Sequence, residues 1–350
     1  MTLRSAAEGF RQLKFRDPEK AREIREALAR VTRSLGRAPV TVMHVCGSHE
    51  QAIAKFGLRS AFPKELDVIM GPGCPVCVTD IPEVDEAVAL SGQGVRIATY
   101  GDMLRVPGSA GSLADARAKG AAVDVVYSVS QAVEIARSTD APVVFFASGF
   151  ETTAVATAAA VKAEIPENFS VLSAHKYIPP VMEIVAEMPS SRIEGFLAAG
   201  HAATITGWGV FEGLVERHGI PVVVAGFEPL DILAGLVRLV EMVRDATMDV
   251  VNMYPRCVTR EGNLEAQKSL WDVFHPVGGR WRGIAHVPNG NLRLNDRWAH
   301  VDARRRFDID VESLWRYAPP SLVEDCICGD IMAGIASPTD CKLFGEACRP

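Results

Sequence analysis

The stretch Val143-Val-Phe-Phe-Ala-Ser-Gly-Phe-Glu151 decides the fold class, because it joins a short apolar run to a polar turn ahead of a helix. A brief β-branched run with Gly or Pro at its borders is typical of a buried parallel strand. Seven further runs share these features: Val40–Val45, Leu66–Met70, Val95–Thr99, Val123–Tyr127, Phe169–Ser173, Ile193–Ala198 and Pro221–Ala225. Helical segments separate many of these runs, at Asp80–Leu90, Ser130–Arg137 and Thr152–Ala163, and the last run leads into a long apolar helix, Leu230–Met242. Strands that alternate with helices predict an α/β fold.

A second Gly-Phe-Glu sequence indicates that the α/β unit occurs twice. Val222-Val-Val-Ala-Gly-Phe-Glu228 again places an apolar run before this tripeptide and an apolar helix after it. We therefore predict two similar parallel-sheet domains facing a cleft, at residues 39–150 and 151–250. We expect N-terminal helices at residues 1–38, which would pack with the C-terminal region. After about residue 250 the alternation gives way to Gly-, Trp- and Arg-containing loops, so residues 251–350 are predicted to be helical or irregular.

The bulk composition is that of a soluble globular protein. The 350 residues are 48% hydrophobic and 23% charged, and the formal net charge is −6. No apolar segment resembles a signal peptide, and none approaches the roughly 20 residues of a membrane span. We therefore expect a cytoplasmic protein that binds neither nucleic acid nor a membrane. Because that compartment keeps thiols reduced, the eight cysteines indicate metal binding or redox chemistry rather than structural disulfides.

Four of these cysteines are concentrated near the C-terminus, at Cys326, Cys328, Cys341 and Cys348. Four soft thiolates in one short segment match either a [4Fe–4S] cluster or a structural zinc ion. Zinc ribbons favour a C-x2-C pair, whereas this segment begins with C-x-C. The spacing therefore favours the iron–sulfur cluster over zinc.

Cys74-Pro-Val-Cys77 is a C-x-x-C sequence just past a predicted strand and ahead of a predicted helix. Two thiols at this spacing form a reversible disulfide, and a nearby helix N-terminus lowers the pKa of one of them. Half of a zinc site is the alternative, but Cys257 alone does not supply a second pair of ligands. We predict a redox pair, with Cys257 as a structural residue.

Cys46 and His49 lie three residues apart where a helix should begin, with Glu50 beside them. Two side chains on the same face of the helix would share a metal ion or form a thiolate–imidazole pair. A buried Cys is usually a small hydrophobic residue, but polar neighbours surround this one, which favours a functional role. A nucleophilic Cys is a further possibility.

Polar residues also follow most of the remaining predicted strands. Because ligands bind beyond the carboxyl ends of parallel strands, these residues predict one composite site between the two halves: Asp102, Arg105, Glu151, His175, Lys176, His201 and Glu228. Several of these side chains have a purely structural alternative. Helix capping would account for Glu151 and Glu228, a salt bridge for Asp102 and Arg105, and simple surface exposure for His175 and Lys176.

Taken together, these motifs resemble the HypD family, which takes part in the maturation of [NiFe]-hydrogenases. The resemblance covers roughly residues 40–350 and rests on Cys46–Glu50, Gly71–Cys77, Asp102–Gly108, Gly149–Thr153, His175–Pro180, Ala225–Asp231 and the four C-terminal cysteines. Gly200-His201-Ala-Ala-Thr fits the family more loosely, and Cys257 matches none of its cysteine motifs.

The resemblance implies a scaffold that helps to assemble the Fe(CN)2CO group of these hydrogenases, rather than a stand-alone metabolic enzyme. Cys46 would bind the Fe(II) jointly with the small chaperone HypC, with His49 close by, and HypE would deliver cyanide made with HypF. Cys74 and Cys77 would exchange electrons with the [4Fe–4S] cluster. The hydrogenase large subunit would be an indirect partner.

Two further functions are compatible with parts of the sequence. A thioredoxin-like thiol–disulfide oxidoreductase would use Cys74 and Cys77 but leaves Cys46 and the C-terminal cysteines unexplained. An iron–sulfur electron-transfer protein without an assembly role would use only the cluster.

Overall fold

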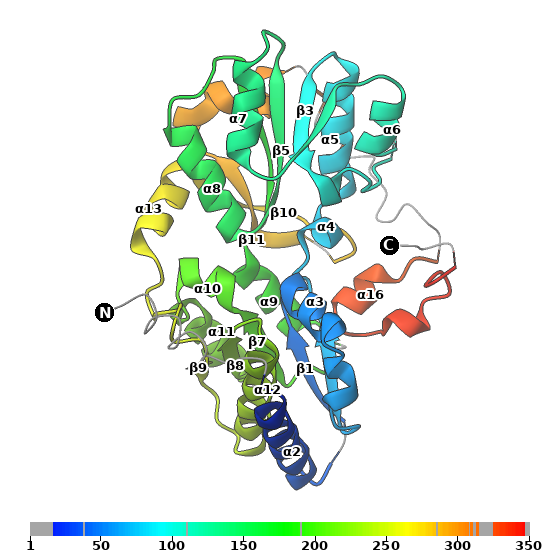
Figure 1. Ribbon diagram of the computed structural model, residues 1–350, viewed down its shortest axis with the longest axis vertical. Coiled ribbons are helices and arrows are strands. Elements are labelled where there is room, and N and C mark those ends of the chain that lie inside the picture. The colour runs from blue at the N-terminus through cyan, green and yellow to red at the C-terminus, as the bar shows by residue number, and fades with distance from the viewer. Residues whose placement is uncertain are drawn as a thin grey trace. The chain divides into compact units, whose positions relative to one another are not determined.

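The computed structural model describes residues 17–37, 39–109, 111–189, 191–284, 286–307, 309–310, 313–314 and 325–346. The chain forms two compact units, each made of two separate segments (Figure 1). The first unit comprises the residues up to Gly71 together with Arg192–Gly262, and the second comprises Pro72–Ser191 together with the residues from Asn263 onward. Both units contain a parallel sheet with helices, which confirms the predicted α/β class.

The first unit is built on a five-stranded parallel sheet in the order β2-β1-β7-β8-β9. Its elements are α2 (Pro18–Ser34), β1 (Val40–His44), α3 (Gly47–Lys55), η1 (Leu58–Ala61), β2 (Leu66–Met70), β7 (Gly195–Ala199), α10 (Gly200–Thr206), η3 (Gly209–Phe211), α11 (Glu212–His218), β8 (Val222–Ala225), α12 (Pro229–Arg244) and β9 (Val250–Asn252). Helices α2 and α12 lie side by side, and one core cluster joins Leu28 and Val31 of α2 to Leu236 and Leu239 of α12 (Figure 1).

The second unit contains a four-stranded parallel sheet in the order β4-β3-β5-β6 and an antiparallel hairpin, β10-β11. Its elements are α4 (Pro75–Val78), α5 (Ile81–Gly92), β3 (Arg96–Tyr100), η2 (Gly101–Met103), α6 (Leu113–Ala118), β4 (Val123–Val126), α7 (Val129–Arg137), β5 (Val143–Gly149), α8 (Glu151–Lys162), β6 (Phe169–His175), α9 (Ile178–Glu187), α13 (Leu264–Val273), β10 (Phe274–Arg280), β11 (His286–Leu294), η4 (Asp296–Val301), α14 (Ala303–Arg306), α16 (Cys328–Met332) and η5 (Pro338–Asp340).

Strand β5 is buried on both faces of this sheet, as its continuous apolar sequence predicts. Val143 and Phe145 contribute to one core cluster, whereas Val144 and Phe146 contribute to the other. The strand ends at Gly149, whose φ of +128° is strained for any L side chain. A Cβ atom there would lie 1.9 Å from Thr153 Oγ1. Glycine therefore lets the chain turn directly from β5 into α8.

The division of the chain differs from the predicted contiguous domains. β1 pairs with β7, more than 140 residues later in the sequence, so residues 39–150 and 151–250 are each shared between the two units. A local apolar run identifies a strand but carries no information about its distant partner. Residues 1–38 were predicted to pack with the C-terminal region, whereas α2 belongs to the first unit and packs there on α12; residues 1–16 lie outside the described part of the chain.

Two further expectations need correction. The region after residue 250 is more regular than predicted, because it contains β9, α13 and the β10-β11 hairpin. The two Gly-Phe-Glu sequences also follow strands that are not equivalent: β5 is the third strand of its unit along the chain, and β8 is the fourth. The units nevertheless share one strand order, because both sheets run second-first-third-fourth. Their likeness lies in topology and not in the repeated tripeptide.

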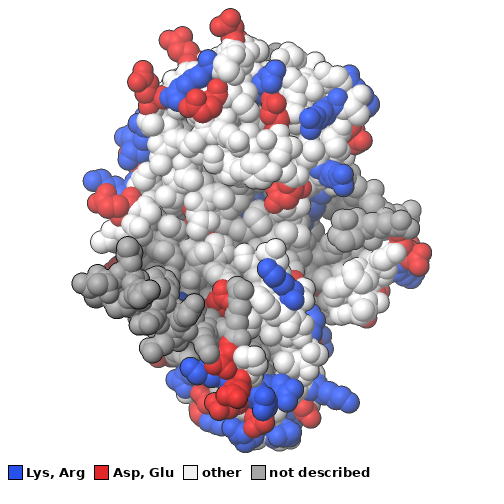
Figure 2. Space-filling model, viewed as in Figure 1, with Lys and Arg blue, Asp and Glu red and all other residues white. Residues whose placement is uncertain are grey.

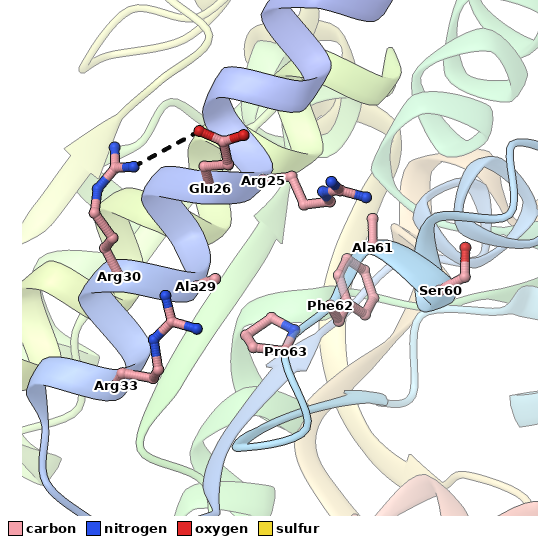
Figure 3. Close-up of a pocket in the computed structure, with 9 residues that line it drawn as sticks. All are labelled: Arg25, Glu26, Ala29, Arg30, Arg33, Ser60, Ala61, Phe62 and Pro63. Atoms are coloured by element: carbon pink, nitrogen blue, oxygen red, sulfur yellow. Dashed lines mark ion pairs between the residues drawn. The ribbon is translucent and has the colours of Figure 1, made fainter.

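The surface of the described residues shows mixed charge. On the face in Figure 2, Lys and Arg side chains lie among Asp and Glu side chains. In the first unit, a groove between α2 and the segment Ser60–Pro63 is lined by Arg25, Arg30 and Arg33, and Glu26 reaches Arg30 at 3.9 Å (Figure 3). None of the predicted site residues lines it. Among the described helices, none is long and apolar enough to cross a membrane.

Candidate functional site

The predicted site residues are divided between the two units. Cys46, His49, Glu50, His201 and Glu228 belong to the first unit, and Cys74, Cys77, Asp102, Arg105, Glu151, His175 and Lys176 belong to the second. In each sheet the strand order reverses beside the first strand, which is where open parallel sheets bind ligands. This position lies between β1 and β7 in the first unit, and between β3 and β5 in the second.

Cys46 lies at the carboxyl end of β1, where it is the N-cap residue of α3. Its side chain is buried, at 2% exposed, and packs with Ala199, Ala202 and Phe227. Its Sγ is 3.8 Å from Nδ1 of His201, which follows β7. The thiol and this imidazole therefore flank the reversal point of the sheet, beside an apolar cluster.

His49 has a different environment from the one its spacing predicts. Its Nε2 donates a hydrogen bond of 3.0 Å to the Gly226 carbonyl oxygen, and its ring lies 4.8 Å from that of Phe227. Burial lowers the pKa of His49 to about 3, so the imidazole is neutral. His49 joins α3 to the end of β8, and the imidazole paired with the Cys46 thiol is that of His201.

Glu50 and Glu228 have structural roles in the same unit. Glu50 accepts hydrogen bonds from His44 Nε2 at 2.9 Å and from Arg59 Nη2 at 2.7 Å. These two partners outweigh burial and lower the pKa of Glu50 to about 2. Glu228 is the N-cap residue of α12, and its N–H donates to Asp231 in a capping box, so the capping explanation is confirmed.

In the second unit, Cys74 is the N-cap residue of α4 and its Sγ accepts a hydrogen bond from the Cys77 N–H at 3.3 Å. The Cys77 thiol also donates to Cys74, and together these bonds lower the pKa of Cys74 to about 7 although burial opposes the shift. The same interaction raises the pKa of Cys77, which is solvent-exposed. Cys74 is therefore the more acidic thiol of the pair, and a lowered pKa is typical of the nucleophilic thiol of such a pair.

Three charged or titratable side chains act on this dithiol. Asp102, after β3, raises the pKa of Cys74, and Arg282 lowers that of Cys77. Cys328, the first residue of α16, raises the pKa of Cys77, so one C-terminal cysteine lies within electrostatic range of the pair. Asp102 and Arg105 are both exposed, and the described residues show no ion pair between them.

The C-terminal cysteines are only partly described. Cys326, Cys328 and Cys341 form no disulfide with one another, and Cys348 lies outside the described residues. Among the described residues, no three His, Cys, Asp or Glu side chains are gathered so that they would hold a metal ion. Soft thiolates suit an iron–sulfur cluster as ligands, but the described cysteines are not gathered around one point where a cluster would bind.

His175, Lys176 and Glu151 are fully buried, which rules out a surface position for the first two. His175 Nε2 contacts Thr157 Oγ1 at 3.0 Å, and burial lowers its pKa to about 3. Lys176 Nζ contacts both carboxylate oxygens of Glu83 at 2.8 Å. These two side chains therefore stabilise the second unit from within.

Glu151 also has a structural role, since its Oε1 accepts a hydrogen bond of 2.8 Å from the Ile178 N–H at the start of α9. Pro179 and Pro180 follow and have no N–H to satisfy. Burial raises the pKa of Glu151 to about 7, and within the described residues its Oε2 has no hydrogen-bond partner. Glu151 thus caps a neighbouring helix.

This raised pKa predicts a pH-dependent loss of stability. The unfolded carboxyl titrates near 4.5 and the folded one near 7, so the stabilising effect is complete below pH 4.5 and is lost as the pH rises through 7. At about 1.4 kcal/mol per pKa unit the loss is about 3 kcal/mol. We expect Glu151→Gln to remove this loss of stability with rising pH. The measurement is the free energy of urea unfolding of the variant and of the parent, each at pH 5 and at pH 8. Glu134→Gln, an exposed control, should leave the pH profile unchanged; a parallel profile for Glu151→Gln would contradict the prediction.

Several residues of both sites were not predicted. Phe227 contacts the rings of His49 and His201, at 4.8 and 5.0 Å between centroids. Arg282 and the fully buried Trp281 belong to the β10-β11 connection, which was predicted to be irregular. In this Gly-Phe-Glu sequence Glu228 was the predicted site residue, whereas its neighbour Phe227 is the residue that contacts the two imidazoles.

Comparison with known proteins identifies the family. Residues 19–350 match the HypD family model, described as the hydrogenase formation hypA family. The chain is 39% identical to hydrogenase maturation factor HypD2 of Bradyrhizobium diazoefficiens, over 97% of this chain and 91% of that protein. It is 39% identical to HypD of Cupriavidus necator (96% and 90% covered) and 37% identical to HypD of Escherichia coli K12 (96% and 91%). Since both the family model and these relatives match nearly the whole chain, it belongs to the HypD family of hydrogenase maturation factors.

Proposed function

We propose that this chain is the scaffold on which the Fe(CN)2CO group of [NiFe]-hydrogenases is assembled. Membership of the HypD family places the chain in hydrogenase maturation. In the proposed reaction, the iron is the cargo and Cys46 is its ligand from this chain. A HypC-type chaperone would share the iron, and a HypE-type protein would supply the cyanide.

The observation that carries this proposal is the position of Cys46. It is a buried thiol at the reversal point of a parallel sheet, 3.8 Å from the imidazole of His201. Cyanide and carbon monoxide favour low-spin Fe(II), and a soft thiolate suits that ion. The apolar contact with Phe227 limits the access of water to the sulfur. His201 would orient the thiolate from the neighbouring strand.

Cys74 and Cys77 would supply the electrons that release cyanide from its carrier. If cyanide arrives as a thiocyanate, R–S–C≡N, two electrons and one proton break the S–C bond to give R–SH and CN⁻. Oxidation of the dithiol to a disulfide releases two electrons and two protons, so one proton is left over. The C-x-x-C spacing and the lowered pKa of Cys74 suit this role.

We further propose that Cys326, Cys328, Cys341 and Cys348 bind a [4Fe–4S] cluster. The thiolate donor set suits this group, and Cys328 lies within electrostatic range of Cys77. When bound, the cluster would supply single electrons that return the disulfide to the dithiol. The chain's own contribution is to hold α16 beside the redox pair.

Infrared spectroscopy of the complex with a HypC-type chaperone tests the proposed function. We expect absorption bands of Fe-bound cyanide and carbon monoxide after anaerobic co-purification from cells that contain the cyanide donor. Cys74→Ser and Cys77→Ser should retain iron but show an incomplete set of bands. A complex that never shows these bands, from cells that make active hydrogenase, would exclude the assembly function.

The lowered pKa of Cys74 also supports a second function, a general thiol–disulfide oxidoreductase. Rapid reduction of insulin disulfides by the iron-free chain would favour it. We expect little such activity, because the proposed substrate is bound to a specific partner.

A further inference from the structure

The β10-β11 connection brings one arginine, Arg282, to the dithiol. The Arg282 backbone N–H donates a hydrogen bond of 3.0 Å to the carbonyl oxygen of Val78, the last residue of α4 and the neighbour of Cys77. Its Nη2 donates to the Pro107 carbonyl oxygen at 2.8 Å. Both ends of this residue are therefore fixed, and its guanidinium lies within electrostatic range of the Cys77 thiol.

One N–H of this guanidinium is unused. Arg282 Nε is buried and has no hydrogen-bond partner among the described residues. A buried donor without a partner costs free energy, unless an acceptor becomes available in another state of the protein. Neither cysteine sulfur accepts from it in this structure; a thiolate that approached Nε would be such an acceptor, whereas a disulfide is a poor one.

The next residue joins this connection to the cysteine-bearing helix α16. Gly283 has a φ of +72°, and its backbone lies against that of Gly329. A Cβ on Gly329 would lie 1.9 Å from the Gly283 carbonyl oxygen, so only glycine permits this approach. Cys328 precedes Gly329, and the segment from Trp281 to Gly283 thus contacts both α4 and α16.

We propose that Arg282 is a positioning residue that sets the redox equilibrium of the Cys74–Cys77 pair by stabilising its reduced form. The reduced pair carries negative charge on sulfur and the disulfide carries none, so a fixed guanidinium favours reduction. Asp102 acts in the opposite direction on Cys74, so the charge on Arg282 offsets part of the effect of this carboxylate. This inference rests on the redox role proposed for the pair.

The test is the equilibrium of the full-length, anaerobically purified chain with glutathione, in which the disulfide and two GSH give the dithiol and GSSG. Peptide mapping by mass spectrometry measures the Cys74–Cys77 disulfide directly. We expect Arg282→Gln to shift the equilibrium about tenfold toward the disulfide, equivalent to ~30 mV. Arg282→Lys, which keeps the charge, should stay close to the parent. Arg297→Gln, an exposed arginine paired with Asp272, is the matched control and should have no effect.

Two results would overturn the proposal: an unchanged equilibrium in Arg282→Gln, or equal shifts in Arg282→Gln and Arg282→Lys, which would mark Arg282 as an anchor of the backbone only. The comparison of Arg282→Gln with Arg282→Lys separates the loss of the charge from the loss of side-chain packing. None of these readouts needs bound iron cargo or a partner protein. The Arg282 proposal can therefore fail while the infrared bands support the proposed function, and the proposed function can fail while the Arg282 proposal holds.

Discussion

Cys46→Ser is expected to abolish the infrared bands of Fe-bound cyanide and carbon monoxide in the complex with the HypC-type chaperone. A serine hydroxyl is a hard donor that stays protonated at neutral pH, so it does not replace a thiolate on low-spin iron. The side chain is nearly isosteric and the site is buried, so the fold should survive. We expect iron content and hydrogenase activity in cells to fall to background.

The matched control for this experiment is Cys257→Ser. Cys257 belongs to the same unit but is exposed, beside Tyr254, and is not among the residues packed around Cys46. The Cys257→Ser variant should leave the infrared bands unchanged. His201→Ala should have an intermediate effect, with iron held about 10–100-fold more weakly, the range for losing a residue that orients a metal ligand. Full bands in Cys46→Ser would remove the basis of the proposed function.

The sequence predicted the strands well because their cause is local. Leu66–Met70 coincides with β2, and the apolar run that opens at Val143 is β5, since a buried parallel strand must be apolar along its whole length. The order of the strands was not predictable in this way. The pairing of β1 with β7 depends on contacts between distant segments, and it is this pairing that places His201 beside Cys46.

The same distinction applies to the site residues. Cys46, Cys74 and Cys77 were predicted from short spacings, and the structure places Cys46 and Cys74 at the N-caps of α3 and α4, with Cys77 inside α4. The roles of His49, His175 and Glu151 depend on partners far along the chain: the Gly226 carbonyl, the Thr157 hydroxyl and the Ile178 N–H. A polar residue after a strand can face a site or satisfy a buried backbone group, and the sequence alone does not distinguish the two.

Lys176→Met is expected to destabilise the second unit by about 3–5 kcal/mol, the cost of leaving one partner of a buried ion pair without its counter-charge. Lys176 is 0% and Glu83 1% exposed in their side chains, and Nζ lies 2.8 Å from both carboxylate oxygens and 3.1 Å from Asn291 Oδ1. Methionine fills a similar volume, so the loss should reflect the charge of Glu83 rather than a cavity. Urea unfolding with an unchanged m-value measures it.

A second substitution separates the charge from the packing. Glu83→Gln in the Lys176→Met background removes the stranded carboxylate, and we expect it to recover a large part of the lost free energy. Lys162→Met breaks a partly exposed pair with Asp272 and should cost less than about 1 kcal/mol. No recovery in the double variant would show that the pair is not the source of the loss.

The Lys176–Glu83 pair also reaches the start of α5, because Glu83 accepts a hydrogen bond from the Asp80 N–H, three residues after Cys77. Lys176→Met should therefore also loosen the start of this helix, next to the redox pair.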